Sequence, residues 1–237
     1  MMFRWLSMID KLWPWATLLA VLGATLPAAA GDEPLLPPLT LEDVAARVEA
    51  AWNEIDDLDV IVELEQYNPT DGAVTSGRGR LRALVPDLFR FDWLLPDMMA
   101  GSILLIDRAR NEARQYNPVR EEIIVQQWDQ LAQEQNLGQD VDRWLTLPDA
   151  GDYALELGKP AVEGHRAYYT VLARPHGDPG QLYEFLVDPE TWLVQEFRYY
   201  DPSGRLLLRG RLADVTINHG VSEERLRRLP PAAVRHR

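Results

Sequence analysis

The stretch GRLRALVPDLFRFDW at residues 79–93 decides the fold class. Two short runs of alternating side chains are separated in it by the break Val85-Pro86-Asp87. Because successive side chains of a strand point to opposite faces, this pattern predicts two neighbouring β-strands. One face of the second strand receives only aromatic side chains, namely Phe89, Phe91 and Trp93. Three aligned rings form either a filled core or the wall of an apolar cavity, and the sequence leaves both readings open.

Working outward, the same alternation recurs along most of the chain and changes to helical spacing in three places. Apolar residues three and four apart follow Thr40, which begins a capping-box pattern. The predicted elements are a helix over 41–57, strands within 59–127, a short helical insertion over 128–146, strands within 152–217 and a short helix over 222–229. About eleven short strands joined by tight turns predict a mainly β (α+β) fold whose antiparallel sheet curls or closes.

The first thirty residues have the pattern of a signal peptide. Basic residues precede an apolar run of about 15 residues, which is shorter than the ~20 that a spanning helix needs. Ala28 and Ala30 then form an Ala-x-Ala site directly before Gly31. We therefore expect residues 1–30 to be removed on export and 31–237 to form one domain. A retained N-terminal anchor is the alternative.

Composition excludes several classes of function. The chain of 237 residues contains no cysteine, so it has no disulfide, no thiolate nucleophile and no thiolate metal site. Its formal net charge is −13, and loss of Arg4, Asp10 and Lys11 with the signal peptide makes it −14. Such a negative balance argues against nucleic acid as a partner and against adhesion to a surface of anionic lipid headgroups.

The sequence contains no motif that predicts catalysis, a cofactor or a metal site. Glu163 and His165 could act as a base and its orienting group, but a hairpin histidine beside an acidic residue is more often simply solvated. The aromatic residues are the stronger signal, because they fall on the apolar faces of elements that should pack together. The candidates for a hydrophobic ligand cavity are Trp52, Val85, Phe89, Phe91, Trp93, Leu105, Tyr116, Phe185 and Phe197. Met98 and Met99 suit a flexible lid or loop over such a cavity.

Several stretches taken in order resemble one known family. They are GRLRALVPDLFRF at 79–91, SILLID at 102–107, LVDP at 186–189, YDPSG at 200–204 and DVTIN at 214–218. Their order and spacing are similar to those of the periplasmic outer-membrane lipoprotein carriers (the LolA-like family). The resemblance implies a strongly curved, incomplete antiparallel barrel of about eleven strands, with a helical lid over an apolar cavity. One departure is Val85, where the best-known carriers often have an arginine tied to lid closure.

The resemblance also implies a function. We expect a monomeric periplasmic carrier, not an enzyme, that shields acyl chains of lipoproteins or lipids during transfer to the outer membrane. It implies an inner-membrane donor complex and an outer-membrane acceptor as partners. The alternative is an envelope sensor or interaction domain of the same fold, which binds lipid or lipoprotein and signals to a regulator.

Overall fold

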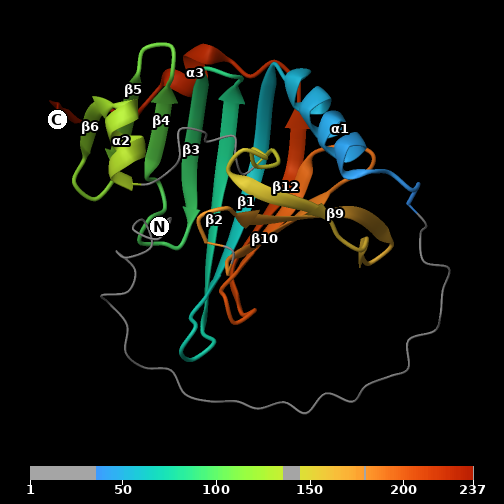
Figure 1. Cartoon of the computed structure of the whole chain (residues 1–237). Helices are drawn as coiled ribbons and strands as arrows, with labels where there is room; N and C mark the ends of the chain where they lie inside the picture. The colour runs from blue at the N-terminus through green and yellow to red at the C-terminus, as the bar shows by residue number, and fades with distance from the viewer. Residues whose placement is uncertain (1–35, 136–144, 179, 237) are drawn as a thin grey trace.

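The computed structural model describes residues 36–135, 145–178 and 180–236, which form one large sheet and three helices (Figure 1). The predicted signal peptide and its cleavage site at Ala28, Ala30 and Gly31 lie outside these residues. The helices are α1 (Leu41–Asn53), α2 (Trp128–Gln135) and α3 (Glu223–Arg227). The strands are β1 (Asp57–Tyr67), β2 (Val74–Leu84), β3 (Leu88–Leu95), β4 (Ile103–Asp107), β5 (Glu112–Asn117), β6 (Glu122–Gln127), β7 (Tyr153–Leu157), β8 (Ala161–Glu163), β9 (Arg166–Pro175), β10 (Leu182–Val187), β11 (Val194–Tyr200), β12 (Leu206–Ile217) and β13 (Ala233–His236).

The sheet is curved and does not close. Its strand order is β13-β6-β5-β4-β3-β2-β1-β12-β11-β10-β9-β7, and β8 pairs with β9 outside this path. Figure 1 shows β1 to β5 standing upright, whereas β9 and β10 run across them at the other end of the sheet. The predicted mainly β fold with an incomplete, strongly curved barrel is therefore confirmed.

Two strands were not predicted from the sequence. β8 has only three residues, and β13 is formed by the polar tail, where all four side chains are exposed. Neither segment has a hydrophobic alternation long enough to predict a strand. Each is held in the sheet by backbone pairing with one neighbour. β13 also pairs in parallel with β6, so the sheet is not antiparallel throughout. The described residues thus contain thirteen strands, not about eleven.

Helix α1 begins as predicted. The side chain of Thr40 accepts a hydrogen bond from the backbone N–H of Asp43, and the Asp43 carboxylate accepts one from the backbone N–H of Thr40. This reciprocal capping box satisfies two N–H groups that a helix start leaves without partners. Val44 and Val48 then form the fully buried stripe of the helix, at 0% and 2% exposure.

The end of α1 is not where the sequence predicted it. The helix ends at Asn53 instead of residue 57, and β1 already begins at Asp57. The backbone N–H groups of Asp56 and Asp57 both donate to the side-chain oxygen of Asn218, at 2.8 and 3.2 Å. Helical spacing continues to Ile55, but a contact 162 residues along the chain stops the helix.

The concave face of the sheet carries two apolar clusters. The α2-side cluster contains buried residues of β1 to β5, namely Leu58, Val60, Val62, Leu81, Ala83, Phe89, Ile106 and Ala113, covered by Trp128, Leu131, Ala132 and Leu145. The α1-side cluster contains Tyr169, Val171, Ala173, Phe185, Val187, Val194 and Phe197, covered by Val44 and Val48. The predicted covers are thus present: α1 lies on one cluster, and α2, the first part of the insertion predicted over 128–146, lies on the other. Residues 136–144 of that insertion lie outside the described residues.

The convex face is also covered at one place. Helix α3 places Leu226, fully buried, against Leu88 and Leu105, which are 3% and 2% exposed. Next to this cluster the guanidinium of Arg90 donates to the carbonyls of Leu226 and Arg228 at the end of α3. In the described ranges, none of the helices has the length and apolar character needed to cross a membrane.

Candidate functional site: the concave face of the sheet

The register of the strands explains why the concave face is apolar. Phe89 pairs with Ala83 of β2 and with Ile106 of β4, and Phe91 pairs with Leu81 and Leu104 in the same way. Directly paired residues share a face of the sheet, so the aromatic face of β3 continues across its neighbours without a polar interruption. On the α1 side, Phe185 and Phe197 are directly paired on the same face.

Seven of the nine predicted cavity residues lie on this concave side, and they are buried to different degrees. Phe89, Phe185 and Phe197 are 1%, 6% and 6% exposed and belong to the two clusters. The half-buried ones that pack against the α2-side cluster are Trp52, Val85 and Phe91. Trp93 is half-buried as well, and its ring meets Phe91 edge-on with 4.6 Å between centroids. The fully buried rings are therefore core, and the half-buried ones line an accessible margin.

The other two predicted residues, Leu105 and Tyr116, lie on the opposite face. Leu105 pairs with Arg90, and Tyr116 pairs with Ile103, which shares the face of Leu105. Leu105 is buried beneath α3 instead of in the concave space. The run ILLI at 103–106 is apolar at every position, so its period does not reveal which side chains face the concave side.

Two glycines that sequence reasoning missed shape the floor of this face. A Cβ added to Gly79 would lie 2.2 Å from the ring of Phe91, and one added to Gly210 would lie 2.1 Å from the ring of Phe197. Each aromatic ring therefore lies flat against the neighbouring strand, in the space that a side chain would fill if the glycine were another residue. Once the strand register is known, such a site can be recognised in the sequence. It is a glycine on the neighbouring strand that shares the face of an aromatic residue beside it.

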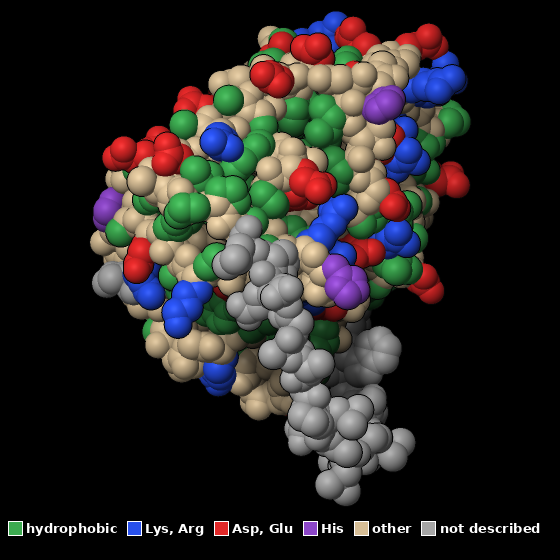
Figure 2. All heavy atoms as spheres, turned by 90° about the vertical axis from the view of Figure 1, so that its right-hand side faces the viewer, with side chains coloured by type: hydrophobic (Ala, Val, Ile, Leu, Met, Phe, Trp, Pro, Cys, Tyr) green, Lys and Arg blue, Asp and Glu red, His purple; other side chains and the backbone are tan. Residues whose placement is uncertain are grey.

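Half-buried apolar side chains lie on the concave side of four strands, β1, β3, β10 and β12. These side chains, which we call the central strip, are Leu64, Phe91, Trp93, Tyr183 and Leu208. Leu64 packs against both apolar clusters and so joins them. On the α1 side, Tyr183 stacks on Tyr199 with 4.8 Å between ring centroids. Figure 2, which views the molecule from the α1 and β9 side, shows hydrophobic side chains gathered between charged ones.

The predicted loop residues lie at the turn after β3. Met98 is 58% exposed and Met99 is half-buried. Leu94 and Leu95, at the end of β3, are also exposed, at 41% and 45%. This turn therefore exposes apolar side chains to solvent directly after Trp93. A role for Met98 and Met99 in covering a ligand stays a prediction.

The convex face differs in kind, because it carries arginine–carboxylate pairs. Asp92 accepts hydrogen bonds from Arg90 at 2.7 Å and from Arg82 at 2.6 Å. Burial raises the pKa of Asp92, but the two guanidinium groups lower it by more, so its net pKa lies below the ordinary value. The two faces thus divide the chemistry of the sheet: apolar inside the curve and ionic outside it.

Comparison with known proteins supports the fold. No protein-family model matches the chain, and no curated protein matches it in sequence. An uncharacterized conserved protein from Thermus thermophilus has a similar structure, with a TM-score of 0.58, 17% identity and coverage of 83% of this chain and 98% of that one. MucB is similar with a TM-score of 0.51 and 16% identity, covering 81% of this chain and 64% of its own. The chain therefore spans less than two thirds of the MucB structure.

A LolA superfamily protein also has a similar structure. It is protein NE2245 from Nitrosomonas europaea, with a TM-score of 0.43, 13% identity and coverage of 81% of this chain and 99% of that one. Identities this low concern the fold alone. The curved, unclosed sheet and its helical covers are the features of the fold that the sequence resemblance implied.

Proposed function

We propose that this protein binds an acyl chain of a lipoprotein or lipid on the concave face of its sheet. The observation that carries the proposal is the central strip, which stays half-buried although the apolar face around it is covered. Transfer of a chain of ~14 carbons from water to such a surface contributes about 0.8 kcal/mol per CH₂, or about 11 kcal/mol before binding costs. The strip needs no polar recognition to obtain this energy.

The arrangement of the covers supports the proposal. Helix α1 contacts β7, whereas α2 contacts β5 and β6 at the other end of the sheet. Helix α1 covers the α1-side cluster through Val44 and Val48, and its Trp52 also packs against the α2-side cluster. An acyl chain on the strip would therefore lie beside both clusters. Gly79 and Gly210 keep the floor low there, since Phe91 and Phe197 lie flat on the strands.

The setting that we propose is the periplasm. Export with cleavage after Ala30 would place a negatively charged binding protein, and not an enzyme, between two membranes. The carrier role, with an inner-membrane donor and an outer-membrane acceptor, rests on the family resemblance and the shared fold. Release of the cargo then depends on a competing acceptor, because the apolar contact itself has no switch.

A sensor is the second candidate. MucB, which shares the fold at a TM-score of 0.51, has also been solved in complex with MucA(peri). A protein of the present fold could likewise bind a regulator while an acyl ligand occupies its concave face. The two candidates differ in what accompanies the protein: a carrier holds an acylated cargo, and a sensor also holds a protein partner.

Native mass spectrometry of the protein purified from its own periplasm tests the proposal. The mass of the protein shows whether the chain begins at Gly31, and accompanying masses show acylated species or a protein partner. We expect an acylated ligand that a fluorescent fatty-acid analogue displaces in a saturable titration. A folded sample without an acylated ligand and without saturable probe binding would contradict the proposal.

A further inference from the structure

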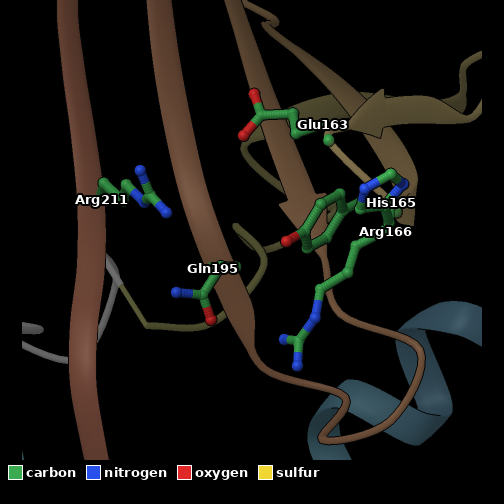
Figure 3. A pocket seen from close by; sticks show the side chains of 7 residues that line it. Glu163, His165, Arg166, Gln195 and Arg211 are labelled. Carbon is green, nitrogen blue, oxygen red and sulfur yellow. The ribbon is translucent and has the colours of Figure 1, made fainter.

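A polar hollow of about 600 Å³ lies on the convex side, where the β8–β9 hairpin meets β11 and β12. It is lined by Glu163, Gly164, His165, Arg166, Tyr168, Gln195 and Arg211. Figure 3 shows Arg211 on one side of this space, Gln195 on the strand beside it, and Glu163, His165 and Arg166 on the hairpin. The hollow is separate from the concave face, because Arg211 pairs in the ladder with Glu63 and Glu196 of the convex side.

The guanidinium of Arg211 has no acidic partner among the described residues. Both neighbouring carboxylates in the ladder are already used: Glu196 lies 2.6 Å from Arg198 and 2.6 Å from Arg209, and Glu63 lies 3.7 Å from Arg78. Arg211 is therefore a spare cation in a chain whose net charge is −13. A guanidinium that faces a hollow without a carboxylate favours an anionic ligand.

Tyr168 is a second, independent sign of a ligand. Its side chain is buried, with 8% exposure, and lines the hollow. Within the described ranges its hydroxyl makes no hydrogen bond with the protein. The hydroxyl oxygen is not one of the buried side-chain atoms without a partner in the described residues, so it opens toward the hollow. There it is a donor available to a ligand.

The lining of the hollow contains two arginines, Arg166 and Arg211, and one carboxylate, Glu163. That carboxylate lies 2.6 Å from Arg198 and 3.8 Å from Arg209, two guanidinium groups that it shares with Glu196. Arg166 lies 3.7 Å from Asp188 and 4.0 Å from Glu190, distances too long for direct hydrogen bonds. The Arg166 guanidinium therefore forms long ion pairs with these two carboxylates, and its N–H groups remain open to a closer hydrogen-bond acceptor.

We propose that this hollow binds a phosphate group. Arg211 on β12 and Arg166 with Tyr168 on β9 approach from different strands, which suits a tetrahedral oxyanion that accepts hydrogen bonds from several directions. A planar carboxylate is satisfied by a single guanidinium fork. The volume exceeds that of a bare phosphate, so the hollow also has room for what the phosphate is attached to, either a lipid headgroup or a small soluble molecule.

Titration followed by ³¹P NMR in phosphate-free buffer tests the site. The probes are inorganic phosphate, glycerol 3-phosphate and dihexanoylphosphatidic acid below its micelle concentration. We expect saturable binding to the mature protein and about tenfold or greater weakening in Arg211→Gln, because a charged hydrogen-bonding partner is lost. Tyr168→Phe removes only the hydroxyl and should weaken binding by a smaller factor. The control is Arg174→Gln. Arg174 is an exposed arginine on β9, the strand of Arg166 and Tyr168, and it lies outside the hollow. Its substitution removes the same charge as Arg211→Gln, and the variant should bind like the wild type.

The probes separate the two sources of phosphate. If the natural ligand is a lipid headgroup, dihexanoylphosphatidic acid should bind most tightly of the three probes. If it is a small soluble molecule, glycerol 3-phosphate should bind at least as tightly as dihexanoylphosphatidic acid. Each variant should bind the fatty-acid probe normally, so this test is independent of the proposed acyl site. Absence of binding by all three probes, or equal weakening in Arg211→Gln and Arg174→Gln, would overturn the proposal.

Discussion

Substitution of the glycines beneath the aromatic rings tests the geometry of the concave face most directly. In Gly79→Ala the new Cβ would lie 2.2 and 2.4 Å from two ring atoms of Phe91, whereas ordinary contacts begin at 3.4 Å. The ring must therefore move by about 1 Å or more. Overpacking of this kind costs ~1–3 kcal/mol. Replacing glycine by alanine within a strand recovers ~0.5–1 kcal/mol of backbone entropy.

The expected loss of unfolding free energy for Gly79→Ala is thus about 1–2 kcal/mol. Gly210→Ala should cost more, ~3 kcal/mol, because the ring that it meets belongs to Phe197, which is 6% exposed inside the α1-side cluster. Phe91 is half-buried and can turn toward the open strip. The matched control is Gly77→Ala on the same strand and face, where the nearest atoms to the new Cβ are 3.8 Å away. We expect that variant to be neutral or slightly more stable than the wild type.

Urea denaturation of the three variants gives the ranking, and the double variant Gly79→Ala/Phe91→Leu should recover most of the loss because the smaller side chain removes the clash. The displaced Phe91 ring should also weaken binding of the fatty-acid probe in Gly79→Ala. If Gly79→Ala proves as stable as Gly77→Ala, the ring does not lie on the strand and the account of the concave floor is wrong.

Two further predictions concern the faces of β3. Phe89→Glu and Leu88→Glu should each lower the unfolding free energy by several kcal/mol in thermal or urea melts, because the side chains are 1% and 3% exposed on opposite faces; a stable Leu88→Glu variant would show that α3 does not cover the convex side. Asp92→Asn should make the protein less stable at neutral pH and remove part of its acid sensitivity. Since the folded pKa of Asp92 is lowered from 3.8, its contribution is present above about pH 4 and is lost as the pH falls through the folded value. Stability curves of wild type and variant that stay parallel from pH 7 to pH 2 would contradict this.

Much of the fold could be predicted from local sequence. The alternation in residues 79–93 predicted β2 and β3 and the side that Phe89, Phe91 and Trp93 share, because a strand has a fixed period of two. The capping box at Thr40 predicted the start of α1 in the same way, because its partners lie within one turn. The resemblance of ordered motifs predicted the curved, unclosed sheet that the structure shows.

The candidate site was only partly predictable. The aromatic residues of β3, β10 and β11 lie on one apolar face as expected, but the sequence could not distinguish the buried rings from the accessible ones. That distinction depends on where α1 and α2 come to rest, and on Gly79 and Gly210 lying beneath particular rings. Leu105 and Tyr116 were assigned to the wrong face, since register across β3, β4 and β5 determines the face when a strand is apolar at every position.

The sequence by itself therefore determined eleven of the thirteen strands of the described residues, the start of α1 and the side chains of β3 that share a face. All of these depend on neighbours within a few residues. Only the tertiary structure decided where α1 ends, which apolar face is concave and how Tyr168 and Arg166 come to share a hollow with Arg211. Each of these depends on pairing between residues that are distant in sequence. The physical reason is that periodicity specifies alternation along one strand, whereas burial and charge balance arise only after strands such as β9 and β12 are brought together across a sheet.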